Sequence, residues 1–192
     1  MPSSFRLRPA FLAKRANISL YYLNLQRHYI LSEKYELIVL KSRVNSFSEM
    51  VIWDGKGSIS ISAHSGKTES KVTSSEKFGN TIYEVRFGND LERLGDITLD
   101  IRCSIKDFGN AFSRTLVKEI RYPTSNLTLE VLTDPYKTVD NISNREYTYL
   151  TDLEFKTRQN NIIERADKST QLLFSIKRPV LRKCYAIKWS EL

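Results

Sequence analysis

The sequence has few of the residues that enzymes most often use to bind metals or to attack substrates. Its 192 residues include only two histidines and two cysteines, and these do not follow the spacing of a zinc site. A glycine-rich phosphate loop, a dinucleotide-binding fingerprint and a nucleophile elbow are also absent from the sequence. We therefore expect no catalytic residue, no metal and no cofactor, and we predict that the protein is not an enzyme.

Long apolar runs and processing signals are missing as well. No run approaches the ~18 apolar residues that cross a bilayer, so we expect no transmembrane segment. The amino end lacks the pattern of a secretion signal, and two widely separated cysteines predict free thiols, so we expect a reducing, cytoplasmic location. Residues 1–32 hold five basic residues and no acidic one, a profile shared with organelle transit peptides, and that alternative stays open.

What the sequence does contain is a repeated alternation of apolar and polar residues. From Ile97 to Lys106 every second residue is apolar, which is typical of a strand with one buried face. The alternation recurs in residues 59–63, 83–87, 127–131, 147–155, 172–176 and 185–189. Turn signals separate these segments, among them Asp54-Gly55, which we expect to close a hairpin. The sequence thus predicts a mainly β fold, an antiparallel β-sandwich of immunoglobulin-like or related Greek-key type, with about nine or ten strands and little helix.

The domain organisation follows from the same patterns. We divide the chain into a basic amino-terminal arm, residues 1–26, and one β-sandwich domain, residues 27–192. Within the arm, residues 10–25 fit both the apolar face of a helix and a strand, so the type of element stays open. The alternative is two small sandwiches that meet near residues 123–126.

The net charge of +8 is concentrated at the two ends of the chain. Residues 156–188 hold nine basic and two acidic residues. Residues 1–32 hold five basic residues and no acidic one. Because the termini of a domain often lie close together, we expect one positive surface. Its candidate binding residues are Arg6, Arg8, Lys14, Arg15, Arg178, Arg182, Lys183 and Lys188. A solvated strand face that carries no function is the alternative explanation of these charges.

The two cysteines receive different predictions from the alternation. Cys103 is in phase with Ile101 and Ile105, so we expect its side chain in the core. Cys184 is out of phase with Tyr185 and Ile187. We therefore expect Cys184 at the surface beside Lys183, with a lowered thiol pKa.

Together these features predict a non-catalytic protein-interaction or recognition module that belongs to a larger assembly as a subunit or accessory factor. The expected partner is a protein that offers an acidic surface or an exposed strand, and self-association through the amino-terminal arm is a further expectation. One alternative is nucleic-acid binding, because aromatic and basic residues interleave in residues 21–29 and 183–189. A second alternative is an enzyme of unknown type.

Overall fold

The computed structural model describes residues 9–22, 28–66, 70–77, 80–108, 112–133, 139–148, 161–164 and 170–191. Thirteen strands and no helix occur in these residues. In chain order the strands are β1 (Phe11–Tyr22), β2 (His28–Val39), β3 (Val44–Val51), β4 (Gly57–Ser65), β5 (Ser70–Lys77), β6 (Asn80–Leu91), β7 (Asp96–Asp107), β8 (Thr115–Glu119), β9 (Thr124–Leu132), β10 (Val139–Thr148), β11 (Asn161–Glu164), β12 (Thr170–Lys177) and β13 (Lys183–Glu191). The predicted mainly β, antiparallel sandwich is confirmed, with more strands than the about nine or ten expected.

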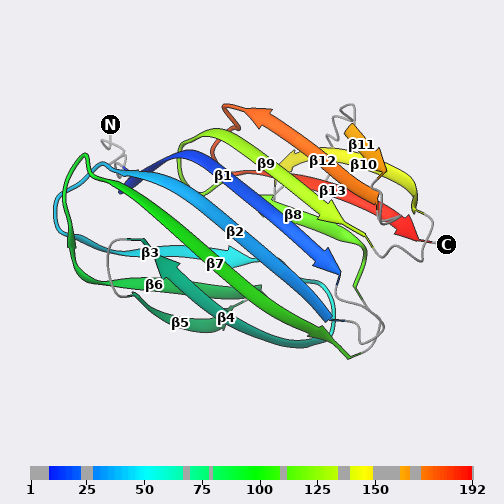
Figure 1. The fold of residues 1–192 in the computed structure, drawn as a ribbon, viewed down its shortest axis with the longest axis horizontal. Coiled ribbons are helices and arrows are strands. Elements are labelled where there is room, and N and C mark those ends of the chain that lie inside the picture. The colour runs from blue at the N-terminus through cyan, green and yellow to red at the C-terminus, as the bar shows by residue number, and fades with distance from the viewer. Residues whose placement is uncertain are drawn as a thin grey trace, which may run out of the picture.

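The strands form one large sheet and two small ones. The large sheet has seven strands in the order β11-β12-β9-β1-β2-β7-β4, and the small sheets have the orders β10-β13-β8 and β3-β6-β5. Figure 1 shows β9, β1, β2 and β7 crossing the molecule side by side, with β3, β6 and β5 toward the bottom of the view and β13 and β10 toward the upper right. Neighbouring strands are antiparallel except β1 and β9, which are parallel. No helix long and apolar enough to cross a membrane occurs in the described part of the chain.

The strands that sequence reasoning missed are short or polar. β5 has the sequence SKVTSSEK, in which Val72 is the single apolar residue, and β8 has five residues. Both lie at an edge of a three-stranded sheet, where one side of the strand forms no ladder with another described strand. Edge strands of this kind need little apolar surface, so the alternation that marks central strands is weak in them.

β1 explains why residues 10–25 fitted two kinds of element. Its buried apolar residues are Phe11 and Ala13 in one phase, then Ala16, Ile18 and Leu20 in the other. The register with β2 shifts between Ala13 and Arg15, and such a bulge inserts one extra residue and changes the phase. The resulting spacing resembles a helical face, although the segment is a strand in the middle of the large sheet. The proposed arm boundary at residue 26 and the alternative boundary near residues 123–126 stay predictions.

The predicted hairpin at Asp54-Gly55 is wrong. β3 pairs with β6 in a small sheet, whereas β4 pairs with β7 at the edge of the large sheet. The connection between β3 and β4 therefore passes from one sheet to the other. A turn signal indicates where the chain reverses or bends, but it does not fix which strands pair.

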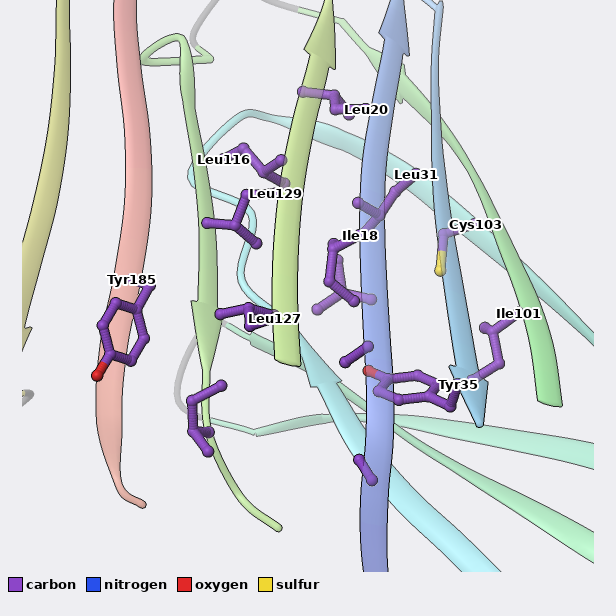
Figure 2. Packing of buried hydrophobic residues seen from close by; sticks show 14 of the residues in the cluster. Ile18, Leu20, Leu31, Tyr35, Ile101, Cys103, Leu116, Leu127, Leu129 and Tyr185 are labelled. Atoms are coloured by element: carbon purple, nitrogen blue, oxygen red, sulfur yellow. The ribbon is translucent and has the colours of Figure 1, made fainter. Parts of the chain in front are cut away.

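The core fills the space between the large sheet and the two small sheets. Figure 2 shows Ile18, Leu31 and Tyr35 from β1 and β2 in the same layer as Leu127 and Leu129 from β9. The alternating apolar residues predicted for β7 are all buried in the core. The side chains of Ile97, Leu99, Ile101, Cys103 and Ile105 are 0–4% exposed. Since burial of one such side chain contributes about 1.5–3 kcal/mol, strict alternation along the central strands is the main physical reason for this fold.

Candidate functional site

Three charged side chains meet in the core between the sheets, and we call them the interior ionic cluster: Glu33, Glu49 and Lys118. The Lys118 ammonium lies 3.0 Å from Oε2 of Glu33 and 3.1 Å from Oε2 of Glu49. The three side chains are 1–4% exposed. Glu33 comes from β2 of the large sheet, Glu49 from β3 of one small sheet and Lys118 from β8 of the other. The cluster therefore joins all three sheets at one point.

Two tyrosines complete the hydrogen bonding of Glu33. The Tyr83 hydroxyl donates to Oε2 of Glu33 at 2.8 Å, and the Tyr35 hydroxyl donates to the same oxygen. Burial, together with the negative charge of Glu33, raises the pKa of both tyrosines well above the ordinary value. Both hydroxyls therefore stay protonated and act as donors to the carboxylate.

The two carboxylates share one ammonium, and the pKa values of Lys118 and Glu49 reflect this. Burial alone would lower the pKa of Lys118, but Glu33 and Glu49 raise it above the ordinary lysine value. Burial raises the pKa of Glu49, and the opposing effect of Lys118 does not fully cancel the increase. Because buried charges are costly unless they are paired, this arrangement holds together only while all three groups are present. The cluster is closed to solvent, so it suits a structural role.

Sequence reasoning missed the interior ionic cluster, although a signal for it exists. Each charged residue occupies the apolar phase of its strand: Glu33 follows Leu31 at a distance of two, Glu49 follows Phe47, and Lys118 lies between Leu116 and Ile120. A charge in the buried phase of a strand predicts a buried partner of opposite charge. Which charges pair cannot be read from one strand, because the three strands belong to different sheets.

The predicted basic surface is only partly assembled. The predicted residues that lie outside the described part of the chain are Arg6 and Arg8. Lys14 forms an ion pair with Asp96 at 2.9 Å, and Arg15 lies 3.6 Å from Glu36. All four of these side chains are substantially exposed, so each pair contributes at most about 1 kcal/mol.

The carboxy-terminal basic residues lie in and after the turn between β12 and β13. Arg178 and Arg182 flank this turn and have positive φ values of 50° and 64°. Lys183, at the start of β13, pairs with Glu146 at 2.7 Å. Lys188 is exposed further along β13, between β10 and β8.

Two of the predicted basic residues from opposite ends of the chain share one end of the large sheet. Arg15 lies opposite Asn126 on β9, which in turn lies opposite Lys177 on β12. The backbone N–H of Arg178 donates to the carbonyl oxygen of Ser125 at 2.7 Å. The structure thus brings Arg15 near Arg178, while Lys188 belongs to a different sheet. Their role as binding residues stays a prediction.

The prediction for Cys184 is wrong. Cys184 is 0% exposed, like Cys103. β13 is the middle strand of its sheet, and consecutive residues Cys184, Tyr185, Ala186 and Ile187 are all buried, so both faces of this strand are covered. Burial, with a smaller effect of Glu119, raises the pKa of the Cys184 thiol to about 12. Burial also raises the pKa of Cys103.

We expect neither cysteine to react with an alkylating reagent in the native protein at neutral pH. The thiolate is the reactive form, and both thiols are buried with raised pKa values. Mass spectrometry after iodoacetamide treatment checks this, with the protein in concentrated guanidinium chloride as the control in which both thiols are labelled. Rapid native labelling that a Cys184→Ser variant removes would contradict the burial of Cys184.

The two histidines lie on different strands of the large sheet. His28 Nε2 lies 2.6 Å from the Ser104 hydroxyl, and His64 is exposed on β4. Across the strands and turns that the structure describes, no group of three or more His, Cys, Asp or Glu side chains could hold a metal ion.

The comparisons with known proteins find a fold and no family. No family model and no curated protein matches the sequence. The fold is similar to an M1 zinc metallopeptidase from Deinococcus radiodurans, with a TM-score of 0.54 and 9% sequence identity over 93% of this chain and 42% of that chain. A form of this enzyme bound to a Tyr-Ser-Ala substrate matches with a TM-score of 0.54, 10% identity and the same two shares.

A third similar structure comes from Parabacteroides distasonis and is named as a candidate protease. Its TM-score is 0.56 with 11% identity, over 93% of this chain and 40% of that chain. At such identities the likeness shows the fold alone. The chain spans less than half the length of these solved structures.

These matches correct the predicted function. A non-catalytic interaction module that uses a basic surface from both termini was expected, with nucleic-acid binding and an enzyme of unknown type as its alternatives. The similar structures described above are M1 zinc metallopeptidase chains and one candidate protease. The zinc named in two of them has no fitting ligand set in the residues that the structure describes. The predicted interaction module is therefore wrong.

Proposed function

We propose that this chain is the β-rich domain of a peptidase-type protein, in which a separate catalytic unit carries out hydrolysis. The observation that carries the proposal is the coverage of the fold match, which takes in 93% of this chain but 42% of the metallopeptidase chain. The remaining part of that chain has no counterpart in these residues. The β domain and the catalytic machinery are then two units, and this chain supplies the first.

The chemistry of the described residues supports this division. They contain no candidate metal cluster, and both thiols are buried with raised pKa values, so these residues offer neither a site for a metal-activated water nor a reactive thiol. The interior ionic cluster is buried and fully paired, which suits a rigid support and leaves no space for a substrate. Rigid scaffolds of this kind position binding surfaces for a neighbouring active site.

Peptidase activity in the native assembly tests the proposal. The protein is tagged in its own cells, purified without denaturant and assayed with fluorogenic peptide substrates, with a zinc chelator added to half of the samples. We expect peptide hydrolysis that the chelator abolishes and added zinc restores, and none from the 192-residue chain produced by itself. Material from untagged cells is the control for contaminating peptidases.

Two results would count against the proposal. One is a native preparation that contains this chain but hydrolyses no peptide in a broad substrate panel. The other is chelator-insensitive hydrolysis by the 192-residue chain itself, because the catalytic group would then lie within this chain.

A further inference from the structure

β4 is the outer strand of the large sheet, and its sequence leaves that edge unprotected. Its nine residues, GSISISAHS, include no proline, lysine or acidic residue. Its only sheet partner among the described strands is β7, and the pairing is regular from Gly57 to Ser65. Natural sheets usually protect a long edge with charges, proline or a bulge. An edge without these devices is suited to receive another strand.

The register shows which backbone groups of β4 point outward. The Phe108 N–H donates to the Lys56 carbonyl oxygen at 2.6 Å, and Gly66 N–H donates to the Thr98 oxygen at 3.4 Å. In an antiparallel ladder, bonded residues alternate along the strand, so the even-numbered residues of β4 bond to β7. The N–H and C=O groups of Ile59 and Ile61 therefore point away from β7.

β5 contacts the outer edge of β4 at one end of that strand. β5 follows β4 in the chain, and the Ser70 hydroxyl donates to the carbonyl oxygen of Ala63 at 3.2 Å. At the opposite end of the two strands lies a groove of about 410 Å³, which we call the β4–β5 groove. Its walls include Gly57 and Ile59 from β4, and Ser74 and Glu76 from β5. The two strands are thus close at one end and separated by a groove at the other.

The lining of the β4–β5 groove points to a polar, extended ligand. Ser74, Ser75 and Thr81 supply hydroxyl groups, and Glu76 is the charged residue among its lining side chains. Glu76 forms no ion pair with any side chain in the described part of the chain. Trp53 also lines the groove, and its buried indole Nε1 has no hydrogen-bond partner among the described residues.

We infer that the β4–β5 groove binds an extended peptide segment as an added strand beside β4, with a cationic group of the peptide near Glu76. Backbone hydrogen bonds to Ile59 and Ile61 would give affinity that depends little on peptide sequence. This inference rests on the proposed function, since it names an extended peptide as the kind of substrate that the domain holds. β5 forms the far wall, so the groove suits a single peptide strand and not the edge of a second folded copy, which would bring its neighbouring strands.

The test measures binding to the 192-residue chain of a synthetic probe, an acetylated nine-residue peptide of alternating valine and threonine with a lysine at each end. Fluorescence anisotropy gives the dissociation constant, and amide chemical shifts locate the site. The central variant is Ile59→Pro, which removes an outward N–H and no bond to β7. Ile59→Ala is its matched control, because it removes the same side chain and keeps the N–H.

We expect shifts confined to β4, β5 and the Trp53 indole N–H, and binding at least ~10-fold weaker for Ile59→Pro than for Ile59→Ala, which is the loss of about 1.4 kcal/mol. A probe N-methylated at alternate residues should bind the unchanged protein as weakly as the unmodified probe binds Ile59→Pro. This second measurement tests the backbone hydrogen bonds even if Ile59→Pro does not fold. Glu76→Gln should weaken binding several-fold, and Glu92→Gln, on the exposed connection between β6 and β7, should not.

Equal binding by both Ile59 variants, or shifts located elsewhere, would overturn the inference. So would self-association that Ile59→Pro abolishes, because a second copy would then be the occupant of the β4 edge. The assay involves no hydrolysis, so its result is separate from that of the proposed function. Peptidase activity in the native assembly without probe binding would overturn only the inference that the groove binds a peptide. Probe binding without peptidase activity in the native assembly would overturn only the proposed function.

Discussion

Replacing Lys118 with methionine is expected to destabilise the protein by about 3–5 kcal/mol. The substitution keeps most of the side-chain volume but removes the ammonium that lies 3.0 Å from Glu33 and 3.1 Å from Glu49. Two carboxylates would then remain in the core without a cation, and their burial would no longer be compensated. Because domains are typically stable by about 5–15 kcal/mol, this loss is a large part of the total.

Urea denaturation followed by tryptophan fluorescence measures the effect. Lys34→Met is the matched control, since Lys34 is an exposed lysine on the same strand as Glu33 and should change stability by no more than about 0.5 kcal/mol. Adding Glu33→Gln and Glu49→Gln to Lys118→Met should recover part of the lost stability, because the buried charges are then gone. A Lys118→Met variant as stable as Lys34→Met would contradict the structural role of the interior ionic cluster.

Replacing Phe47 with alanine is expected to cost a similar amount, about 3–5 kcal/mol. Phe47 lies on β3, is 0% exposed and packs against aromatic rings of other elements. Its ring centroid lies 5.5 Å from Phe11 on β1, 5.1 Å from Tyr35 on β2 and 5.0 Å from Tyr122. The substitution would leave a cavity where one small sheet meets the large sheet, and the surrounding rings are too constrained to fill it.

Thermal and chemical denaturation check this result. Phe108→Ala is the matched control, because Phe108 is 70% exposed and its loss should change stability by no more than about 0.5 kcal/mol. Equal stability of Phe47→Ala and Phe108→Ala would contradict the packing described between β3 and the large sheet. Phe47 also contacts Tyr35, which bonds Glu33, so the effects of Phe47→Ala and Lys118→Met should not add exactly.

The parts of the fold that could be predicted from sequence are the strands with one buried face. In β7 the apolar residues from Ile97 to Ile105 alternate without interruption, and all of them are buried. β1 shows where that reasoning fails, since one bulge after Ala13 changes the phase and makes a strand resemble a helix. For β13 the prediction from alternation fails for another reason. Both faces of this strand are covered, so Cys184 is buried although it is out of phase with Tyr185 and Ile187.

The pairing of distant strands could not be predicted, because it depends on contacts between residues far apart in the chain. Asp54-Gly55 suggested a hairpin, yet β3 and β4 pair with different sheets. The same limit applies to the interior ionic cluster: Glu33 and Lys118 are 85 positions apart, and only the folded arrangement brings them together. The groove beside β4 also depends on how β5 diverges from β4, which no local pattern indicates.

The proposed function requires that this chain belong to a larger assembly with a peptidase unit. Native mass spectrometry of the tagged protein, purified from its own cells, tests this most directly, with metal content measured on the same sample. We expect a species heavier than the sum of the 22.3 kDa chain and its tag, in which a zinc-binding unit is present either in the same polypeptide or in a bound one. A species with only the mass of the 22.3 kDa chain and its tag, and without zinc, would contradict the proposed function.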